Sequence, residues 1–392
     1  MRLAICIDAD VPSELLRDSL VIGQALVARG HSLAYVVGNP MRFVDHAGGA
    51  VPNEIYQAPI RDASPLTTRR ASENGLTDRL AASGFEDKQT LLTLTVMWRR
   101  LIDKLQPEAI IGFYCPIVWL VAPAYVPTFA VGNGLALPPT LGTSFPRVSP
   151  EPVPVASEEQ MLTNANAALT RVGQSSIAAL SDLLDRCISI LYGISALDPY
   201  LRYRKTNSRG LLGHEPKPIV PPASPRIAAF LDAYCPNIET IVLAIAASTK
   251  IPFDLCVAGA STGMRRFLEQ HEHITIWHDY ANLLERAANA SVLVHHGFQD
   301  VAQRCLTLGR PELIFPWTPA QYFLDHSINW MGFTWTKSTD TSIDDLVGTF
   351  EAVLRDTTIA VSAQHHAKQL ADFELRDALP EIVSEIERAR VQ

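Results

Sequence analysis

The sequence of 392 residues lacks an excess of positive charge. Its 33 Lys and Arg residues and 41 Asp and Glu residues give a formal net charge of -8 at pH 7. Nucleic acid and anionic lipid both require a basic surface on a protein partner, so this balance favours neither of them. We expect a small or neutral ligand instead.

Long apolar runs are missing as well. No uninterrupted apolar segment approaches the roughly 18–20 residues needed to span a bilayer, so no stable membrane insertion is expected. The first strand-like run, residues 2–7, is followed at once by Asp8 and Asp10. This does not fit the longer apolar core and small-residue cleavage site of a signal peptide. These features predict a cytoplasmic protein.

Patterns typical of metal sites are also absent. The six cysteines lie far apart, and none forms a CxxC pair of the kind found in zinc sites and redox couples. We interpret them as small buried hydrophobic residues. The pairs His271/His273 and His365/His366 have no acidic or sulfur ligands nearby at metal spacing, which favours surface histidines. The sequence therefore predicts no metal and no other resident cofactor.

The length and the apolar content of 47% are sufficient for two separate cores. Residues 2–7 are predicted to form a strand, residues 15–28 a helix and residues 33–37 a second strand, which makes a parallel βαβ unit. A second alternation of strands and helices begins at Arg226, after a proline-rich segment. We therefore predict an α/β fold with two doubly wound sheets, each binding ligands at the carboxyl ends of its strands. The expected parts are an N-terminal domain (1–204), a linker (205–225), a C-terminal domain (226–375) and a C-terminal helix (376–392).

The most informative segment spans residues 290–332. A buried strand ends in His295-His296-Gly297, and a helix follows immediately. After the helix come Gly309 and Pro311, a second apolar strand ending in Pro316, and Gln321. A helix that begins directly after a strand presents free backbone N–H groups and the positive end of its dipole, an arrangement that suits a diphosphate.

This segment resembles the donor-binding region of the GT-B glycosyltransferases of bacterial antibiotic and lipid-type pathways, whose pattern is H-H-G-G-x-G-T, a helix, G-V-P and then P-x-x-x-D-Q. Leu197-Asp198-Pro199-Tyr200 and Ala28-Arg29-Gly30-His31 are similar to further elements of the family. The resemblance implies two Rossmann-like domains that face each other across a cleft. It also implies that the C-terminal helix crosses back to the first domain.

By this resemblance, His296 contacts the diphosphate of a nucleotide-sugar donor, Gly297 lets the backbone approach it, and Gln321 bonds the sugar. Trp277 or Tyr280 would lie against the nucleotide base. A plain strand-end histidine and aromatic residues that only pack are the alternative interpretations. The family glycines after Gly297 are replaced, and one replacement is an acid, Asp300, where a phosphate oxygen is expected. The expected donor-binding residues are His296, Gly297, Gln299, Asp300, Gln321, Trp277 and Tyr280.

The catalytic positions of the family are altered. Its general-base histidine falls on Leu15 and the aspartate that orients this base falls on Phe113, so neither residue can take a proton. A carboxylate of the same loop and helix start can replace the base if burial raises its pKa. The alternative is that the two acids on the helix are solvated and only favoured by its dipole. The candidate bases are Asp10, Glu14 and Asp18.

The resemblance implies a metal-independent, inverting glycosyltransferase that uses a UDP- or dTDP-sugar and a small-molecule or lipid-like acceptor, as in natural product biosynthesis. The alterations at Leu15, at Phe113 and after Gly297 favour an alternative, a GT-B scaffold without transferase activity that serves as a binding or accessory protein. A sugar-nucleotide epimerase is a third hypothesis.

Overall fold

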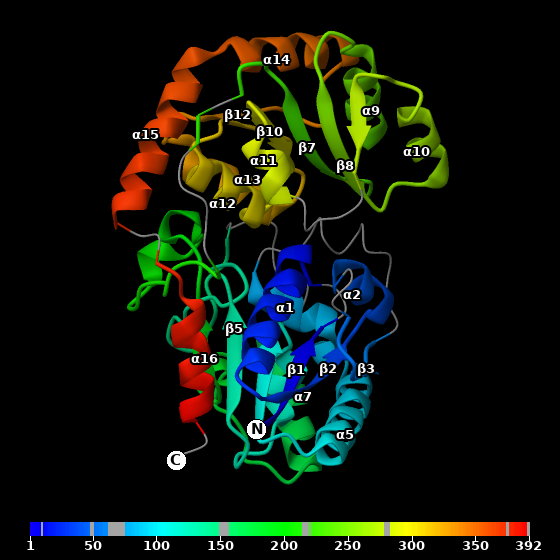
Figure 1. Cartoon of the computed structure of the whole chain (residues 1–392). Helices are drawn as coiled ribbons and strands as arrows, with labels where there is room; N and C mark the ends of the chain where they lie inside the picture. The colour runs from blue at the N-terminus through cyan, green and yellow to red at the C-terminus, as the bar shows by residue number, and fades with distance from the viewer. Residues whose placement is uncertain are drawn as a thin grey trace. The chain divides into compact units, whose positions relative to one another are not determined.

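The computed structural model describes residues 1–8, 11–47, 51–61, 75–148, 157–213, 219–220, 222–277, 283–373 and 376–389. The chain divides into two compact units (Figure 1). The first comprises Met1–His214 and Arg376–Gln392, and the second comprises Glu215–Leu375. Among the described helices, none combines the length and apolar character of a membrane-spanning segment.

The first unit is built on a parallel sheet with the strand order β3-β2-β1-β4-β5-β6. The residues of β4 and β5 are fully buried, as are all but the first residue of β1, which is why these strands read as continuous apolar runs in the sequence. The chain turns to β2 and β3 on one side of β1 and to β4 on the other, so the topological switch point lies between β1 and β4. The strands are β1 (Arg2–Ile7), β2 (Ser32–Val37), β3 (Ile55–Gln57), β4 (Ala109–Phe113), β5 (Thr128–Gly132) and β6 (Ile188–Leu191).

Helix α5 shows how the helices of this unit arise from their sequence. Its N-cap, Asp87, accepts a hydrogen bond from the backbone N–H of Thr90 at 2.7 Å. The helix ends where Gln106 adopts a left-handed conformation. Between these ends, Leu94, Trp98 and other apolar residues at helical spacing are buried in the core. The helices are α1 (Ser13–Ala28), α2 (Pro40–Ala47), α4 (Leu76–Leu80), η1 (Ala81–Phe85), α5 (Lys88–Leu105), α6 (Pro116–Val121), α7 (Glu158–Arg171), α8 (Asp182–Asp185), η2 (Ser195–Leu197), η3 (Leu201–Tyr203) and α16 (Leu379–Arg388).

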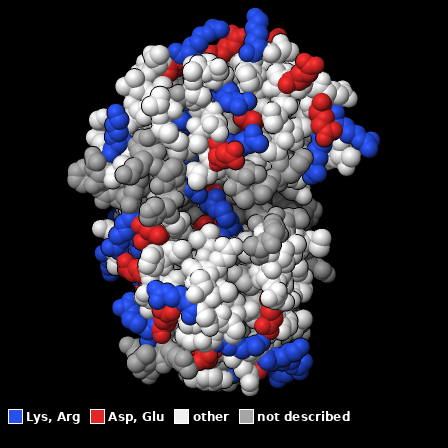
Figure 2. All heavy atoms as spheres, in the orientation of Figure 1, with Lys and Arg blue, Asp and Glu red and all other residues white. Residues whose placement is uncertain are grey.

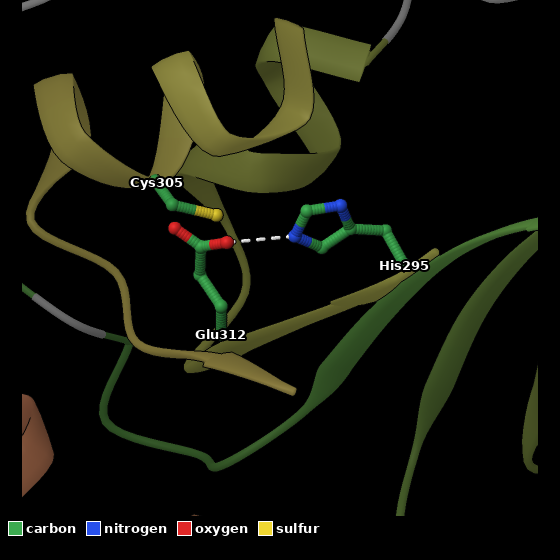
Figure 3. A group of neighbouring side chains, drawn as sticks. All are labelled: His295, Cys305 and Glu312. Atoms are coloured by element: carbon green, nitrogen blue, oxygen red, sulfur yellow. Dashed lines mark hydrogen bonds and ion pairs between the residues drawn. The ribbon is translucent and has the colours of Figure 1, made fainter. Parts of the chain in front are cut away.

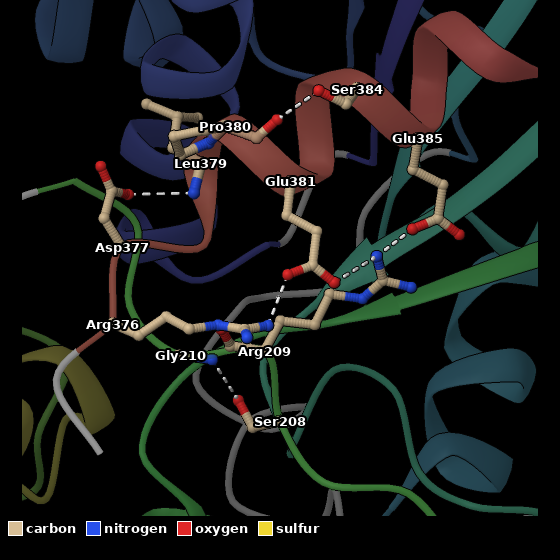
Figure 4. A network of polar contacts seen from close by, with 10 residues as sticks. All are labelled: Ser208, Arg209, Gly210, Arg376, Asp377, Leu379, Pro380, Glu381, Ser384 and Glu385. Carbon is tan, nitrogen blue, oxygen red and sulfur yellow. Dashed lines mark hydrogen bonds and ion pairs between the residues drawn. The ribbon is translucent and has the colours of Figure 1, made fainter. Parts of the chain in front are cut away.

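The C-terminal segment belongs to the first unit. Ile382, Val383 and Ile386 of α16 join the hydrophobic core of this unit. Figure 4 shows the polar contacts around the start of the helix, where Arg209 pairs with Glu385. The backbone N–H of Leu211 also donates to the carbonyl of Arg376 at 2.9 Å. The end of the chain therefore adds both apolar and charged contacts to a domain that begins at residue 1.

The second unit repeats the same architecture with the strand order β12-β11-β10-β7-β8-β9, all parallel. Its switch point lies between β7 and β10. The strands are β7 (Ile227–Asp232), β8 (Phe253–Ala258), β9 (Ile274–Ile276), β10 (Val292–His295), β11 (Glu312–Ile314) and β12 (Thr334–Thr336). The helices are α9 (Ile238–Ala247), α10 (Thr262–Leu268), α11 (Leu283–Ala288), α12 (Gln299–Leu308), α13 (Pro319–Asn329), α14 (Ile343–Arg355) and α15 (Thr357–Phe373). The predicted α/β class with two doubly wound sheets is confirmed.

The distribution of charged side chains on the surface agrees with the composition, which contains both acidic and basic residues in quantity. On the face shown in Figure 2, Lys and Arg side chains are interspersed with Asp and Glu side chains over each unit. They do not gather into one basic patch on that face. An interspersed pattern of this kind is typical of a solvated surface.

Candidate functional site

Polar side chains gather at the switch point of the second sheet. Strand β7 ends at Asp232, and the neighbouring strand β10 ends at His295, so His296 and Gly297 leave the sheet at its carboxyl edge. In doubly wound sheets this edge, at the switch point, is where ligands bind. The charge of Asp232 acts on the ring of His296 and favours its protonated form. Two neighbouring strands therefore bring an acid and a histidine to the same place.

The ring of His296 is fully buried, and one of its nitrogens has no partner among the described residues. Nδ1 lies 2.9 Å from the carbonyl oxygen of Phe315. Because a carbonyl only accepts, Nδ1 carries the hydrogen, and Nε2 of the neutral ring offers a lone pair. Nε2 is buried and makes no hydrogen bond within the described part of the chain. Burial lowers the pKa of His296 to about 4, against the opposing effects of the Phe315 carbonyl and Asp232. An unsatisfied buried acceptor of this kind costs free energy, which a ligand can recover.

Gly297 brings the end of β10 against the first turn of α13. Its φ is +92°, and a Cβ at this position would lie 3.1 Å from both Cβ and the carbonyl oxygen of Gln321. Gln321 also caps α13, because its Oε1 accepts hydrogen bonds from the backbone N–H groups of Trp317 at 3.0 Å and Thr318 at 3.1 Å. Its Nε2 amino group is the donor of this side chain. The structure thus brings the predicted residues Gly297 and Gln321 together.

Helix α12 begins at Gln299, and Gln299 and Asp300 are both buried in its first turn. Two backbone amides just before this helix have a partner within the protein. The backbone N–H groups of Gly297 and Phe298 each donate to Nδ1 of His295 at 3.1 Å. These two amides are therefore not available to a ligand at this edge. What remains for a ligand is the positive end of the helix dipole and the ring of His296.

The two aromatic residues predicted for the nucleotide base differ in what the structure describes. Trp277, directly after β9, is only 5% exposed and packs edge-on against Phe230, with ring centroids 4.9 Å apart. Trp277 therefore belongs to a hydrophobic cluster of the second unit. Tyr280 lies outside the described residues.

The candidate bases of the first unit are on helix α1 and in the loop before it. Asp10 lies outside the described residues. Glu14 and Asp18 are 6% and 7% exposed, so the interpretation of these two acids as solvated is wrong. Asn133 donates to Oε1 of Glu14 at 2.9 Å, and the Tyr192 hydroxyl donates to Oδ2 of Asp18 at 2.7 Å.

The partners of the two acids show where their face of α1 points. Glu14 and Asp18 lie four residues apart and so share one face of the helix. Asn133 directly follows β5 and Tyr192 directly follows β6, so both carboxylates face the carboxyl edge of the first sheet. Burial raises the pKa of Tyr192 well above its usual value, and the charge of Asp18 adds to this effect. Asn133 and Tyr192 were not predicted from the sequence, although a polar residue directly after a buried strand was an available signal.

A further cluster of polar side chains lies behind the His296 turn. Within the described residues, His295, Cys305 and Glu312 are fully buried, and their potential ligand atoms all lie within 4.8 Å of one another (Figure 3). Nε2 of His295 lies 2.7 Å from Oε2 of Glu312. The residues come from β10, α12 and β11, so their spacing in the sequence gave no metal motif.

Neither a comparison with protein-family models nor a search of curated proteins finds a match. Solved structures share the fold over the whole chain. The glycosyltransferase VinC in complex with dTDP has a TM-score of 0.64 at 14% identity, covering 100% of this chain and 99% of its own. SnogD from Streptomyces nogalater has the same TM-score, identity and coverage. The rhamnosyltransferase SpnG complexed with thymidine diphosphate has a TM-score of 0.62 at 16% identity, covering 98% of this chain and 100% of its own. The chain has the GT-B glycosyltransferase fold.

Two positions of this GT-B fold carry core residues where the family pattern predicts titratable ones. Leu15 is 1% exposed and Phe113 is fully buried, and both belong to the hydrophobic core of the first unit. Neither side chain can accept a proton. Any proton acceptor on the described part of α1 must therefore be one of the acids beside Leu15, namely Glu14 or Asp18.

Proposed function

We propose that this chain binds a nucleotide-diphosphate sugar at the carboxyl edge of its second sheet and transfers the sugar to an acceptor. The observation that carries the proposal is the buried Nε2 of His296, which has no partner among the described residues. His296 directly follows the strand at the switch point and is followed by Gly297, which lies against Gln321. Solved relatives in fold, VinC and SpnG, are complexed with dTDP. A dTDP- or UDP-sugar is therefore the donor class to test.

Diphosphate binding requires a change at His296. A phosphate oxygen accepts hydrogen bonds, so Nε2 has to gain a proton before it can donate to it. The resulting imidazolium and the start of α12 both place positive charge near the diphosphate, and the charge of Asp232 stabilises the imidazolium. Nε2 of Gln321 donates to a hydroxyl of the sugar. In this arrangement the helix dipole and a charged histidine stabilise the negative charge of the leaving diphosphate. The proposed transfer therefore requires no metal ion.

The proposed reaction is a single displacement with inversion. An acceptor hydroxyl oxygen forms a bond to the anomeric carbon, the bond from this carbon to the diphosphate oxygen breaks, and the hydroxyl proton passes to a carboxylate of the protein. Asp10, Glu14 and Asp18 remain the candidates for this carboxylate. The acceptor class proposed is a small molecule or a lipid-like molecule.

A second candidate function is binding without transfer, as an accessory scaffold. It is favoured by the burial of Leu15 and Phe113 in the core, because neither can serve as base or orient one. A scaffold of this kind would bind the nucleotide sugar and leave it intact. Incubation with the donor, followed by analysis for released nucleotide, distinguishes the two functions once binding has been shown.

Calorimetric titration with dTDP and with UDP tests the shared first step. We expect at least one nucleotide to bind, and His296→Ala to weaken this binding by about tenfold or more, because a charge-assisted hydrogen bond is lost. His326→Ala is the matched control, since His326 is an exposed histidine of the same unit. Absence of binding of either nucleotide to the wild-type protein rejects the proposal. Equal affinity of the His296→Ala variant and the wild-type protein rejects the assignment of His296.

A further inference from the structure

The buried pair of His295 and Glu312 has a defined distribution of protons. Nδ1 of His295 lies 3.1 Å from the backbone nitrogens of Gly297 and of Phe298. Backbone N–H groups only donate, so Nδ1 must accept and carries no hydrogen. The ring hydrogen is therefore on Nε2, which donates to Oε2 of Glu312 at 2.7 Å. Each polar contact of the ring agrees with this single tautomer.

This proton distribution does not fit a metal site made of His295, Cys305 and Glu312. A metal ion needs the lone pair of Nε2, and a neutral ring would then carry its hydrogen on Nδ1, against two backbone N–H groups. Cys305 gives a second argument. Burial, followed by the charge of Glu312, raises the pKa of its thiol well above the usual value, whereas a metal binds the thiolate. Within this cluster, His295 and Glu312 are better described as a hydrogen-bonded brace for the backbone than as metal ligands.

We propose that Glu312 and His295 act as positioning residues for the donor site. Glu312 keeps the hydrogen of His295 on Nε2, so that Nδ1 stays an acceptor and fixes the backbone of Gly297 and Phe298. Gly297 and Phe298 directly follow His296 and lead into α12. Their fixed backbone therefore determines the position of the His296 ring and of the first turn of the helix. The role of this brace in donor binding rests on the function proposed above. The tautomer and the hydrogen bonds to the two amides do not depend on that function.

The tautomer is measured directly on the whole protein labelled with ¹⁵N in its histidine rings. We expect the His295 spectrum to show an unprotonated Nδ1 and a protonated Nε2, unchanged when zinc is added. A protonated Nδ1 would overturn the proposal. So would stoichiometric zinc that removes the proton from Nε2, since the cluster would then be a metal site. This measurement requires no nucleotide, so it stands even if the chain binds no sugar donor.

A matched pair of substitutions separates positioning from packing. His295→Asn places a carboxamide oxygen near the site of Nδ1 and keeps an acceptor for the two amides, whereas His295→Gln places its nitrogen near the site of Nε2 and keeps only the donor to Glu312. We expect hydrogen exchange at Gly297 and Phe298 to accelerate in His295→Gln and to stay close to wild type in His295→Asn. We also expect dTDP affinity to fall about tenfold in His295→Gln, because the two backbone donors, one of them fully buried, lose their acceptor.

In the same titrations, His295→Asn is expected to stay within about threefold of the wild-type affinity, a change below 1 kcal/mol. Cys305→Ser is a further control. It removes the thiol that a metal site would need but keeps both residues of the brace, so dTDP affinity should not change. Equal losses of affinity and equal exchange rates in the Asn and Gln variants would show that His295 only fills space. If either variant does not fold, the ring spectrum of the wild-type protein decides whether the proposed tautomer is correct.

Discussion

The proton that His296 must gain makes donor binding depend on pH. With a pKa of about 4 in the free protein, protonation of this ring at pH 7 costs about 4 kcal/mol. Binding of a diphosphate to Nε2 has to offset this cost, and one proton is taken up with each ligand. Because the free ring has the lowered pKa, affinity should rise as the pH falls, by about tenfold per pH unit between pH 7 and pH 5. Calorimetry with UDP-glucose or dTDP-glucose measures this slope, and buffers of different ionisation enthalpy report the proton uptake.

The ligand and the control variant keep this measurement specific. A nucleotide sugar is used because the terminal phosphate of a free nucleoside diphosphate itself titrates near pH 6, as phosphate monoesters do. His296→Gln places an uncharged N–H donor near the position of Nε2, so it should bind with little dependence on pH. A wild-type affinity that stays constant between pH 5 and pH 7, without proton uptake, would refute the contact between Nε2 and the diphosphate.

Three further predictions concern stability and catalysis. Gly297→Ala should lower the free energy of unfolding by about 1–3 kcal/mol in chemical denaturation, because of its positive φ and the contact with Gln321 of α13. Gly348→Ala, where a Cβ meets nothing within 4 Å, should instead stabilise α14 by about 0.5–1 kcal/mol. Asp198→Asn should destabilise the first unit by about 3 kcal/mol, since it breaks a buried ion pair with Arg204 at 2.6 Å. Replacing the base should lower kcat of transfer by about 100-fold or more with dTDP affinity unchanged, whereas equal rates in each single variant would exclude all of the candidates. The single variants are Asp10→Asn, Glu14→Gln and Asp18→Asn.

The central strands could be predicted from the sequence because they are buried on both faces. Residues 3–7 of β1 and all residues of β4 give short, uninterrupted apolar runs, which fit strands of a parallel sheet that are buried on both faces. Strands β3 and β12 were not predicted. Each has three residues, lies at the edge of its sheet and is partly exposed, so its sequence carries too few apolar residues to form a pattern.

The carboxyl edge of β10, the proposed donor site, could be predicted in position from the sequence, but its chemistry could not. The spacing of His296, Gly297 and Gln321 depends on strand and helix lengths, which the sequence encodes locally. The state of the two histidine rings depends on contacts that the sequence does not encode locally. Nδ1 of His296 meets a carbonyl 19 residues away, and Nε2 of His295 meets a carboxylate 17 residues away on the neighbouring strand. These partners decide which nitrogen donates and which accepts.

The burial of Glu14 and Asp18 favours catalysis over a passive scaffold. The interpretation of these acids as solvated followed from the dipole of α1. Their hydrogen-bond partners Asn133 and Tyr192 lie 119 and 174 residues away in the sequence, where no local pattern reveals them. A buried carboxylate loses hydration free energy, which its partners have to offset. For Asp18 these partners include Arg17, whose Nη2 lies 3.6 Å from Oδ1. The same helix already buries Leu15 at no such cost, so packing alone does not explain two adjacent acids at the carboxyl edge of the sheet. A proton acceptor has to be a titratable group at that edge, and burial is what moves a carboxylate pKa towards the range useful for a base. We expect the Glu14→Leu and Asp18→Leu variants to be more stable than the wild-type protein and inactive in transfer. This result would show that the free energy cost of burying the two carboxylates serves the function.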